Sequence, residues 1–181
     1  MIVASLGGQG PEAFYRVISP AYAGTPRSGM GAARGGGRFN RPGQEALYLS
    51  RDEATALAEY KQDNPWLQPG TICTFFVDQV RVADLSAGFH PSFWPALWAD
   101  FAIDWRAEWF GQKVEPPTWY MADDVEAAGL DGILFPSQAN SGGTNLVLYQ
   151  SSSRPIAQLD VYDPQGALKS LGVGSAGTGT R

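Results

Sequence analysis

The sequence predicts an α+β protein in which mixed or antiparallel sheets are flanked by helices. Strand-like segments outnumber helical ones, and the two kinds do not alternate regularly, which argues against a doubly wound parallel sheet. The chain has 181 residues, 44% of them hydrophobic and 17% charged, and this is enough to bury the core of one domain. We expect that domain to span residues 1–170, followed by a flexible, glycine-rich tail over 171–181.

The predicted strands are short runs rich in β-branched and aromatic residues, and turn-forming residues bound them. They lie at 14–19, 45–49, 71–77, 80–85, 132–135, 146–149 and 158–162. Residues 24–43, which contain three consecutive glycines, are predicted to form a loop between the first two strands.

Three helices are predicted between the strands. Ser50 and Glu53 have the spacing of a capping box, which predicts a helix that starts here and ends near residue 63. A second helix is predicted over 92–110. A third is predicted over 123–129, where two acidic residues favour the positive helix end and a glycine favours the C-cap.

Large aromatic and aliphatic side chains recur at helical spacing in the 92–110 segment. They are Phe93, Trp94, Leu97, Trp98, Phe101, Trp105 and Trp109. We expect most of this stripe to lie in the core, because tryptophan contributes strongly to burial wherever it occurs. An interface with a partner protein or a second copy is the alternative, since tryptophan is enriched in interfaces.

Net charge and its distribution limit the choice of ligand. The formal net charge of −5 argues against duplex nucleic acid as a direct partner, because that binding depends on neutralising phosphates. Residues 1–51 nevertheless carry six arginines against two acidic residues, Glu12 and Glu45. Such a local cluster favours a compact anionic ligand, whereas the alternative is a solvated basic loop.

Several other chemistries are not favoured. The single cysteine, Cys73, cannot form an internal disulfide, and with the single His90 it offers no metal-ligand cluster, so no metal is expected. The start of the chain has no signal-peptide pattern, and no run of about 18 apolar residues predicts a membrane span. We therefore expect a cytoplasmic protein. Residues 172–177 match a dinucleotide-binding glycine motif, but no helix can follow them.

One block of the sequence carries residues suited to catalysis. Gly36-Gly37 precedes Arg38 and Tyr48 follows ten residues later, so paired strands would turn both side chains toward one cleft. Glu59 lies eleven residues further on, in the predicted helix. Helix geometry alone puts Glu59 on the polar face, opposite an apolar stripe of Ala54, Leu57 and Ala58, and so predicts a solvated side chain.

The same block resembles the RES domain family. The resemblance rests on motifs that occur in order between residues 14 and 150: Tyr15-Arg16, Gly36-Gly37-Arg38-Phe39-Asn40, Gly43, Leu47-Tyr48, Ala56-Leu57-Ala58-Glu59, Gly132 to Ser137, and Asn145. Their combined spacing is specific, although no single motif is. One departure is Phe39, where tryptophan is common in the family.

The resemblance implies a fold similar to that of diphtheria-toxin-like ADP-ribosyltransferases and an activity that consumes NAD⁺. It implies the toxin half of a bacterial toxin–antitoxin pair, whose partner is an antitoxin with a helix-turn-helix domain. By the same resemblance, the NAD⁺ site is lined by Arg38, Tyr48, Glu59 and Ser137, with Asn40 and Arg16 as further candidates. The acceptor of ADP-ribose, which is water, phosphate or a target protein, is left open.

These residue types suit cleavage of the nicotinamide–ribose bond. A carboxylate such as Glu59 stabilises the positive charge that develops on the ribose carbon. Tyr48 can stack on the cationic nicotinamide ring, and the fork of Arg38 can hold the pyrophosphate. Two alternatives remain: a binding module that recognises a phosphorylated ligand without cleaving it, and a glycoside or nucleoside hydrolase, which usually needs a second carboxylate.

Overall fold

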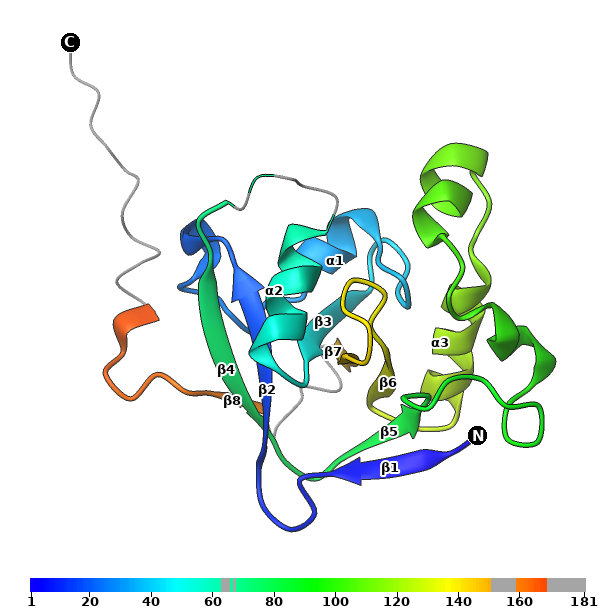
Figure 1. Ribbon diagram of the computed structural model, residues 1–181, viewed down its shortest axis with the longest axis horizontal. Helices are drawn as coiled ribbons and strands as arrows, with labels where there is room; N and C mark the ends of the chain where they lie inside the picture. The colour runs from blue at the N-terminus through cyan, green and yellow to red at the C-terminus, as the bar shows by residue number, and fades with distance from the viewer. Residues whose placement is uncertain (63–65, 67, 151–158, 169–181) are drawn as a thin grey trace.

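The computed structural model describes residues 1–62, 66, 68–150 and 159–168 and confirms the predicted α+β class. Short helices flank one curled, mixed sheet of eight strands in the order β1-β5-β6-β7-β3-β2-β4-β8 (Figure 1). Neighbouring strands are antiparallel except for β5 and β6, which are parallel. The predicted tail at 171–181 lies outside the described residues, and the domain boundary at 170 stays a prediction.

The seven predicted strands are all present, and one more precedes them. The strands are β1 (Val3–Leu6), β2 (Glu12–Ile18), β3 (Glu45–Ser50), β4 (Thr71–Val77), β5 (Val80–Asp84), β6 (Gly132–Pro136), β7 (Thr144–Gln150) and β8 (Leu159–Val161). The sequence analysis missed β1, which adds to the sheet edge through β5.

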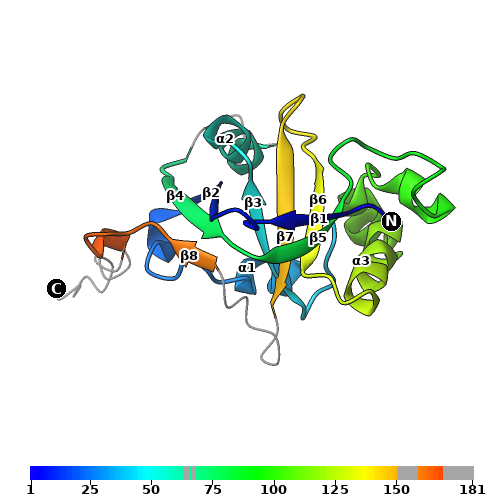
Figure 2. The same cartoon turned by 90° about the horizontal axis from the view of Figure 1, so that it is seen from below.

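The sheet divides between β2 and β3. These two strands are paired only at Tyr15 and Ser50, whereas β2 pairs with β4 from Glu12 to Ile18 and β3 pairs with β7 from Glu45 to Ser50. Beyond the Tyr15–Ser50 pair the two strands diverge and leave a gap between two halves of the sheet. Figure 2 shows β4 and β2 on one side and β7 and β6 on the other, with β3 between them.

Both faces of the central strands are buried, and alternate residues enter two different cores. Leu47 and Leu49 of β3 pack in one cluster with residues of β2, β4 and β7, while Ala46 and Tyr48 face a second cluster. The second cluster contains Trp98 and lies under α3 (Pro117–Ala127). This alternation is the two-residue period of a strand, and it fixes which side chains of β3 can reach each core.

Helix α2 (Glu53–Lys61) begins two residues later than the capping-box pattern predicts. Asp52 is the N-cap: its carboxylate accepts from the Thr55 backbone N–H at 2.8 Å and from the Thr55 hydroxyl at 2.7 Å. The prediction that Ser50 caps this helix was wrong, because Ser50 is the last residue of β3 and its hydroxyl donates to the Asn145 side chain at 2.8 Å. The helix ends at Lys61, near its predicted end.

The loop predicted over residues 24–43 contains one short helix, α1 (Met30–Gly35), which ends at the glycine run. A 3₁₀ turn, η1 (Pro20–Tyr22), lies just before the loop. Gly36 has φ +80°, a conformation that glycine adopts without strain, so the chain can leave α1 sharply at this point.

The single helix predicted over 92–110 was wrong. The segment instead forms a 3₁₀ turn, η2 (Ala96–Asp100), and a π turn, η3 (Ala107–Gln112), separated by residues 101–106. Asp104 interrupts a continuous helix because its carboxylate accepts from the backbone N–H groups of Arg106 and Ala107, both at 3.1 Å.

The aromatic stripe of this segment is divided between core and surface. Trp94, Trp98 and Trp105 are buried, while Phe93 is 53% exposed. The Trp98 indole also donates to Asp124 of α3 at 3.2 Å. Helix α3 itself begins at Pro117, six residues before its predicted start.

Gly132 is expected to be essential to the sheet. A Cβ at this position would overlap the backbone carbonyl of Val147 on the paired strand β7, which cannot move without breaking the ladder. Gly132→Ala should therefore lower the free energy of unfolding by about 3 kcal/mol, measured by chemical denaturation. In the control Gly31→Ala, the added Cβ meets nothing within 4 Å, and stability should be unchanged or rise by up to about 1 kcal/mol. Equal stability of the two variants would contradict the packing described for β6 and β7.

Candidate active site

A cleft of about 1220 Å³ opens where β2 and β3 diverge. Its lining comes from β2, β3, α2 and the 102–106 segment. Its polar lining includes Arg16, Arg38, Tyr48, Glu59, Arg106 and Asn145. The cleft thus brings together four of the six site residues that the sequence predicts. The other two, Asn40 and Ser137, lie behind it and are hydrogen-bonded to its lining.

Arg38 lies in a tight turn inside the predicted 24–43 loop, so the paired strands that could have turned Arg38 and Tyr48 toward one cleft do not occur. The turn is closed by a 2.9 Å hydrogen bond from the Gly37 N–H to the Asn40 carbonyl. A Cβ on Gly37 would overlap the side chains of Asn40 and Tyr48. The glycine is therefore needed to admit the Tyr48 hydroxyl.

Helix α3 anchors this turn from the side opposite the cleft. The Trp119 indole donates to the Gly37 carbonyl at 2.8 Å. The Arg41 guanidinium pairs with Asp123 at 2.6 Å and with Glu115 at 3.1 Å, and these two carboxylates raise the pKa of Arg41 above its ordinary value. Arg41, which follows the turn, is therefore a structural residue, unlike Arg38.

The Arg38 guanidinium is half-buried and faces the cleft. It donates from Nη1 to the carbonyls of Phe101 and Ile103, at 3.1 and 2.7 Å, and from Nη2 to Gln138 Oε1 at 2.7 Å. Burial lowers the pKa of Arg38, and the nearby Tyr48 and Glu59 oppose that shift. All three acceptors are uncharged, so the positive charge is held in place without being neutralised.

Tyr48 offers its ring to the cleft while its hydroxyl is engaged. The hydroxyl oxygen accepts from the Phe39 N–H at 3.0 Å, and the hydroxyl donates to Asn40 Oδ1 at 2.8 Å. Burial raises the pKa of Tyr48 far above its ordinary value, so the phenol stays protonated. Asn40 is fully buried, and its amide also donates to three backbone carbonyls. Asn40 therefore holds Tyr48 in position from behind the cleft.

Glu59 points toward the sheet, contrary to the prediction from helix geometry. Its Oε1 accepts from the Ser137 hydroxyl at 2.7 Å and from the Asn145 amide at 2.6 Å, and its Oε2 accepts from the Gln62 amide at 2.7 Å. The predicted apolar stripe was wrong because Leu57 is 39% exposed, and the buried residues of α2 are Thr55 and Ala56. The helix is rotated so that its small residues pack inward and Glu59 reaches the cleft.

The partners of Glu59 are themselves oriented by further hydrogen bonds. The Ser137 oxygen accepts from the backbone N–H groups of Ala139 and Asn140, at 3.2 and 3.0 Å, so its hydrogen is directed to Glu59. Asn145 Oδ1 accepts from the Ser50 hydroxyl, which directs its amide N–H to the same carboxylate. Ser137 thus contacts Glu59 from the turn after β6, behind the cleft surface.

Arg16 lies on β2 at the other side of the cleft. It donates to the carbonyls of Pro26 and Ser28, both at 3.1 Å, and so fixes the segment that leads into α1. Burial lowers the pKa of this guanidinium. Like Arg38, it has only uncharged acceptors among the residues that the structure describes.

The sequence analysis missed other residues at the site. Asn145 occurs in the family pattern but was given no role, and Gln62, Arg106 and Gln138 were not considered. The last three are single polar residues in segments with no recognisable motif, and only the tertiary fold brings them to the cleft. Within the described chain, no three His, Cys, Asp or Glu side chains are grouped to hold a metal.

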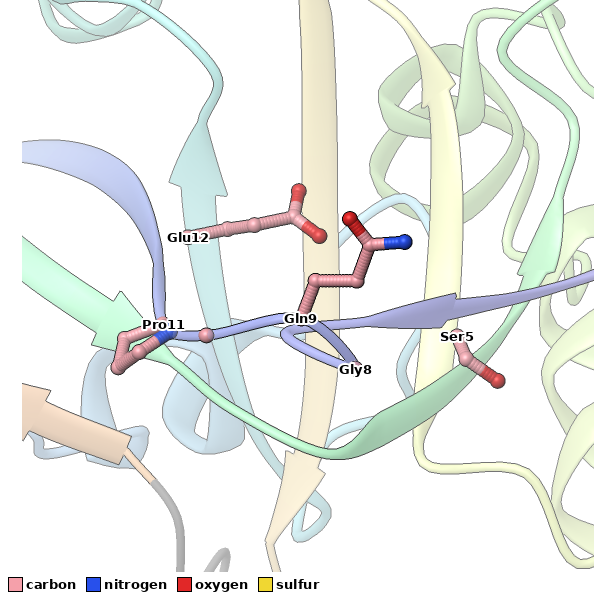
Figure 3. Close-up of a pocket in the computed structure, with 6 residues that line it drawn as sticks. Ser5, Gly8, Gln9, Pro11 and Glu12 are labelled. Atoms are coloured by element: carbon pink, nitrogen blue, oxygen red, sulfur yellow. The ribbon is translucent and has the colours of Figure 1, made fainter.

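A second hollow of about 670 Å³ lies at the β1–β2 turn, where Ser5, Gly8 to Pro11 and Glu12 line it (Figure 3). The Glu12 carboxylate accepts from the Gly7 N–H at 2.8 Å and from Arg51 at 2.7 Å. The Glu12 carboxylate therefore connects the β1–β2 turn to Arg51, the residue that follows β3. None of the predicted site residues lines this hollow, so we place the site at the β2–β3 cleft.

Comparison with known families identifies the family of this chain. The profile of the RES domain family matches residues 13–169, which extend from the second residue of β2 past the end of β8. The chain is a RES domain protein. No curated protein sequence is similar enough to be recognised as a relative.

Among solved structures, this RES domain protein is similar to a chain in the crystal structure of the M. tuberculosis MbcT–MbcA toxin–antitoxin complex. The TM-score is 0.56 and the sequence identity is 22%, over 93% of this chain and 92% of that chain. The likeness therefore extends over nearly the whole fold. In the described part of the chain, none of the helices has the length and apolar character needed to cross a bilayer.

Gly37 provides a test of how the site is packed. Gly37→Ala should displace Tyr48 and Asn40 and lower the free energy of unfolding by about 1–3 kcal/mol, measured by chemical denaturation. Gly35→Ala is the matched control in the same glycine run, because its Cβ meets nothing within 4 Å. If the Gly37 variant is as stable as the Gly35 variant, the Tyr48 hydroxyl does not occupy the space next to Gly37.

Proposed function

We propose that this RES domain protein cleaves the nicotinamide–ribose bond of NAD⁺ and is the toxin of a bacterial toxin–antitoxin pair that acts in the cytoplasm. The observation that carries the proposal is the Glu59 carboxylate, held by three hydrogen bonds in the same cleft as Arg38 and Tyr48. The family membership and the toxin–antitoxin neighbour support the biological role. The partner is then an antitoxin, which we expect to carry a helix-turn-helix domain.

The geometry suits a dissociative cleavage. When the bond between the nicotinamide nitrogen and the ribose carbon breaks, the electron pair leaves with nicotinamide and positive charge develops on the sugar. A carboxylate oxygen has about two acceptor sites, and Glu59 Oε2 accepts a single hydrogen bond, from Gln62, in the described structure. That oxygen can accept from a ribose hydroxyl and stabilise the charged sugar more than the uncleaved substrate.

The other lining residues suit the remaining parts of the dinucleotide. The Tyr48 ring can stack on the cationic nicotinamide, an interaction worth on the order of 1 kcal/mol. Arg38 uses Nη1 and one Nη2 hydrogen for protein acceptors, and its remaining N–H groups can bind the pyrophosphate. The reaction requires no metal ion. An acceptor then attacks the sugar carbon, giving free ADP-ribose with water, its phosphorylated form with phosphate, or a modified target protein.

Glu59→Gln tests the proposal directly. The amide has a similar shape but no charge, so NAD⁺ binding should persist while nicotinamide release falls at least 100-fold, measured by product chromatography. Glu126→Gln, at an exposed position of α3 outside the cleft lining, is the control and should leave the rate unchanged. Wild-type turnover by the Glu59 variant would refute the mechanism. Binding without cleavage by the wild-type protein would instead support a non-enzymatic binding module.

Expression in a bacterium tests the toxin role. Production of the wild-type protein should arrest growth and deplete cellular NAD⁺, and production of the Glu59→Gln variant should do neither. Incubation with labelled NAD⁺, with and without cell extract, separates protein labelling from release of ADP-ribose or its phosphorylated form. Growth arrest with a normal NAD⁺ level would exclude NAD⁺ consumption as the cause of toxicity.

Arg38→Lys tests the need for a planar fork. A lysine cannot reach the two carbonyls and Gln138 at once, so the 101–103 segment loses its attachment and the pyrophosphate loses bidentate contacts. We expect kcat/KM for NAD⁺ to fall about tenfold to 100-fold. Arg34→Lys, on an exposed face of α1, is the control. Unchanged kinetics in the Arg38 variant would remove Arg38 from the site.

A further inference from the structure

Arg106 lines the same cleft as Glu59 and lies outside every motif that carries the family resemblance. It follows the loop 101–105 and precedes η3, and its side chain lines the cleft. The guanidinium carbon lies 4.8 Å from the centroid of the Trp105 ring, which is buried. Nη2 donates to Gln62 Oε1 at 2.7 Å. The guanidinium is therefore held against an aromatic surface at the mouth of the cleft.

Arg106 forms no ion pair with a carboxylate in the described part of the chain. Arg27, Arg41 and Arg51 each form an ion pair with a carboxylate. Arg106 and Arg38 line the same cleft, and the acceptors recorded for them in the described chain are amide or carbonyl oxygens. Their charges also repel each other, since Arg106 contributes to the lowered pKa of Arg38. Glu59 and Asp104 act on Arg38 in the opposite sense, but neither forms an ion pair with Arg38 or Arg106 in the described structure, so the two guanidinium groups can bind an anion.

Gln62 connects Arg106 to the carboxylate of Glu59. Its amide N–H donates to Glu59 Oε2 at 2.7 Å while its amide oxygen accepts from Arg106. The residue stands at the C-cap of α2 with φ +27°, a conformation that side-chain-bearing residues rarely adopt. A neutral amide is a weaker partner for a guanidinium than a phosphate is, so an incoming anion can displace Gln62 from Arg106.

We propose that Arg106 is a second phosphate-binding residue, which exchanges Gln62 for the pyrophosphate of the dinucleotide and holds it jointly with Arg38. The inference rests on the proposed function and assigns a part of the substrate to a residue outside the family motifs. Gln62 keeps its bond to Glu59 during this exchange, so phosphate recognition by Arg106 and charge stabilisation by Glu59 are separate tasks. Arg106 therefore contributes to substrate affinity, and Glu59 to turnover.

The test compares ligands that differ in their phosphates. Isothermal titration measures the affinity of wild-type and Arg106→Gln proteins for ADP-ribose, which has the pyrophosphate, and for nicotinamide riboside, which has none. We expect the variant to bind ADP-ribose about tenfold more weakly, the usual loss for one charged hydrogen-bonding partner, and nicotinamide riboside as the wild type does. In turnover of NAD⁺, KM should rise about tenfold with kcat little changed. Arg106→Lys should fall between the two proteins.

Control variants and measurements distinguish a failure of the role proposed for Arg106 from a failure of the proposed function. Arg81→Gln removes one positive charge from an exposed position on β5 outside the cleft lining, and should change neither affinity. Thermal unfolding confirms that each variant is folded. If the wild type cleaves NAD⁺ and Arg106→Gln binds ADP-ribose normally, or loses affinity for both ligands equally, the role of Arg106 is refuted while the proposed function stands. If the wild type neither binds ADP-ribose nor cleaves NAD⁺, the proposed function itself fails.

Discussion

The hydrogen-bonded carboxylate of Glu59 is the contact on which the site depends. A charged group that leaves water is tolerated only when hydrogen bonds replace its hydration. Ser137, Asn145 and Gln62 supply three such bonds, and they come from the turn after β6, from β7 and from the end of α2. Two of these bonds attach α2 to the sheet through the Glu59 side chain. The same hydrogen bonds therefore fix both the position of α2 and the position of the carboxylate in the cleft.

The division of the sheet supplies the space in which this carboxylate works. If β2 and β3 remained paired beyond Tyr15 and Ser50, Arg16 and Val17 would face Leu49 and Tyr48 across a continuous ladder. They diverge instead, and these four residues line the cleft. The strands stay rigid because each retains a fully paired neighbour on its other side, β4 for β2 and β7 for β3. A rigid floor of this kind keeps catalytic groups in position without ligand.

The arginines of this chain have two kinds of partner: some pair with carboxylates, and others donate to uncharged oxygens. Arg41 is neutralised by two carboxylates and fixes the glycine turn to α3. Arg38, only three residues earlier, meets carbonyl and amide oxygens, which orient its fork without cancelling its charge. Arg16 and Arg106 have the same kind of partners around the cleft. The overall negative charge of the chain therefore coexists with a cleft in which several arginines have uncharged acceptors.

The sequence by itself determined seven of the eight strands and the order of the motif residues, because short apolar runs bounded by turn-forming residues mark strands such as β3 and β7 even where both faces are buried. It could not determine the rotation of α2, since Thr55 and Ala56 are buried through contacts with distant residues, and helix periodicity therefore put Glu59 on the wrong face. Likewise, the 92–110 segment is not one helix, because the Asp104 carboxylate binds the backbone N–H groups that follow it. Ser50 does not cap α2, because it is the last residue of β3. Only the tertiary structure brought Gln62, Arg106 and Gln138 to the cleft, because hydrogen bonds between segments 36 to 100 residues apart leave no local signature.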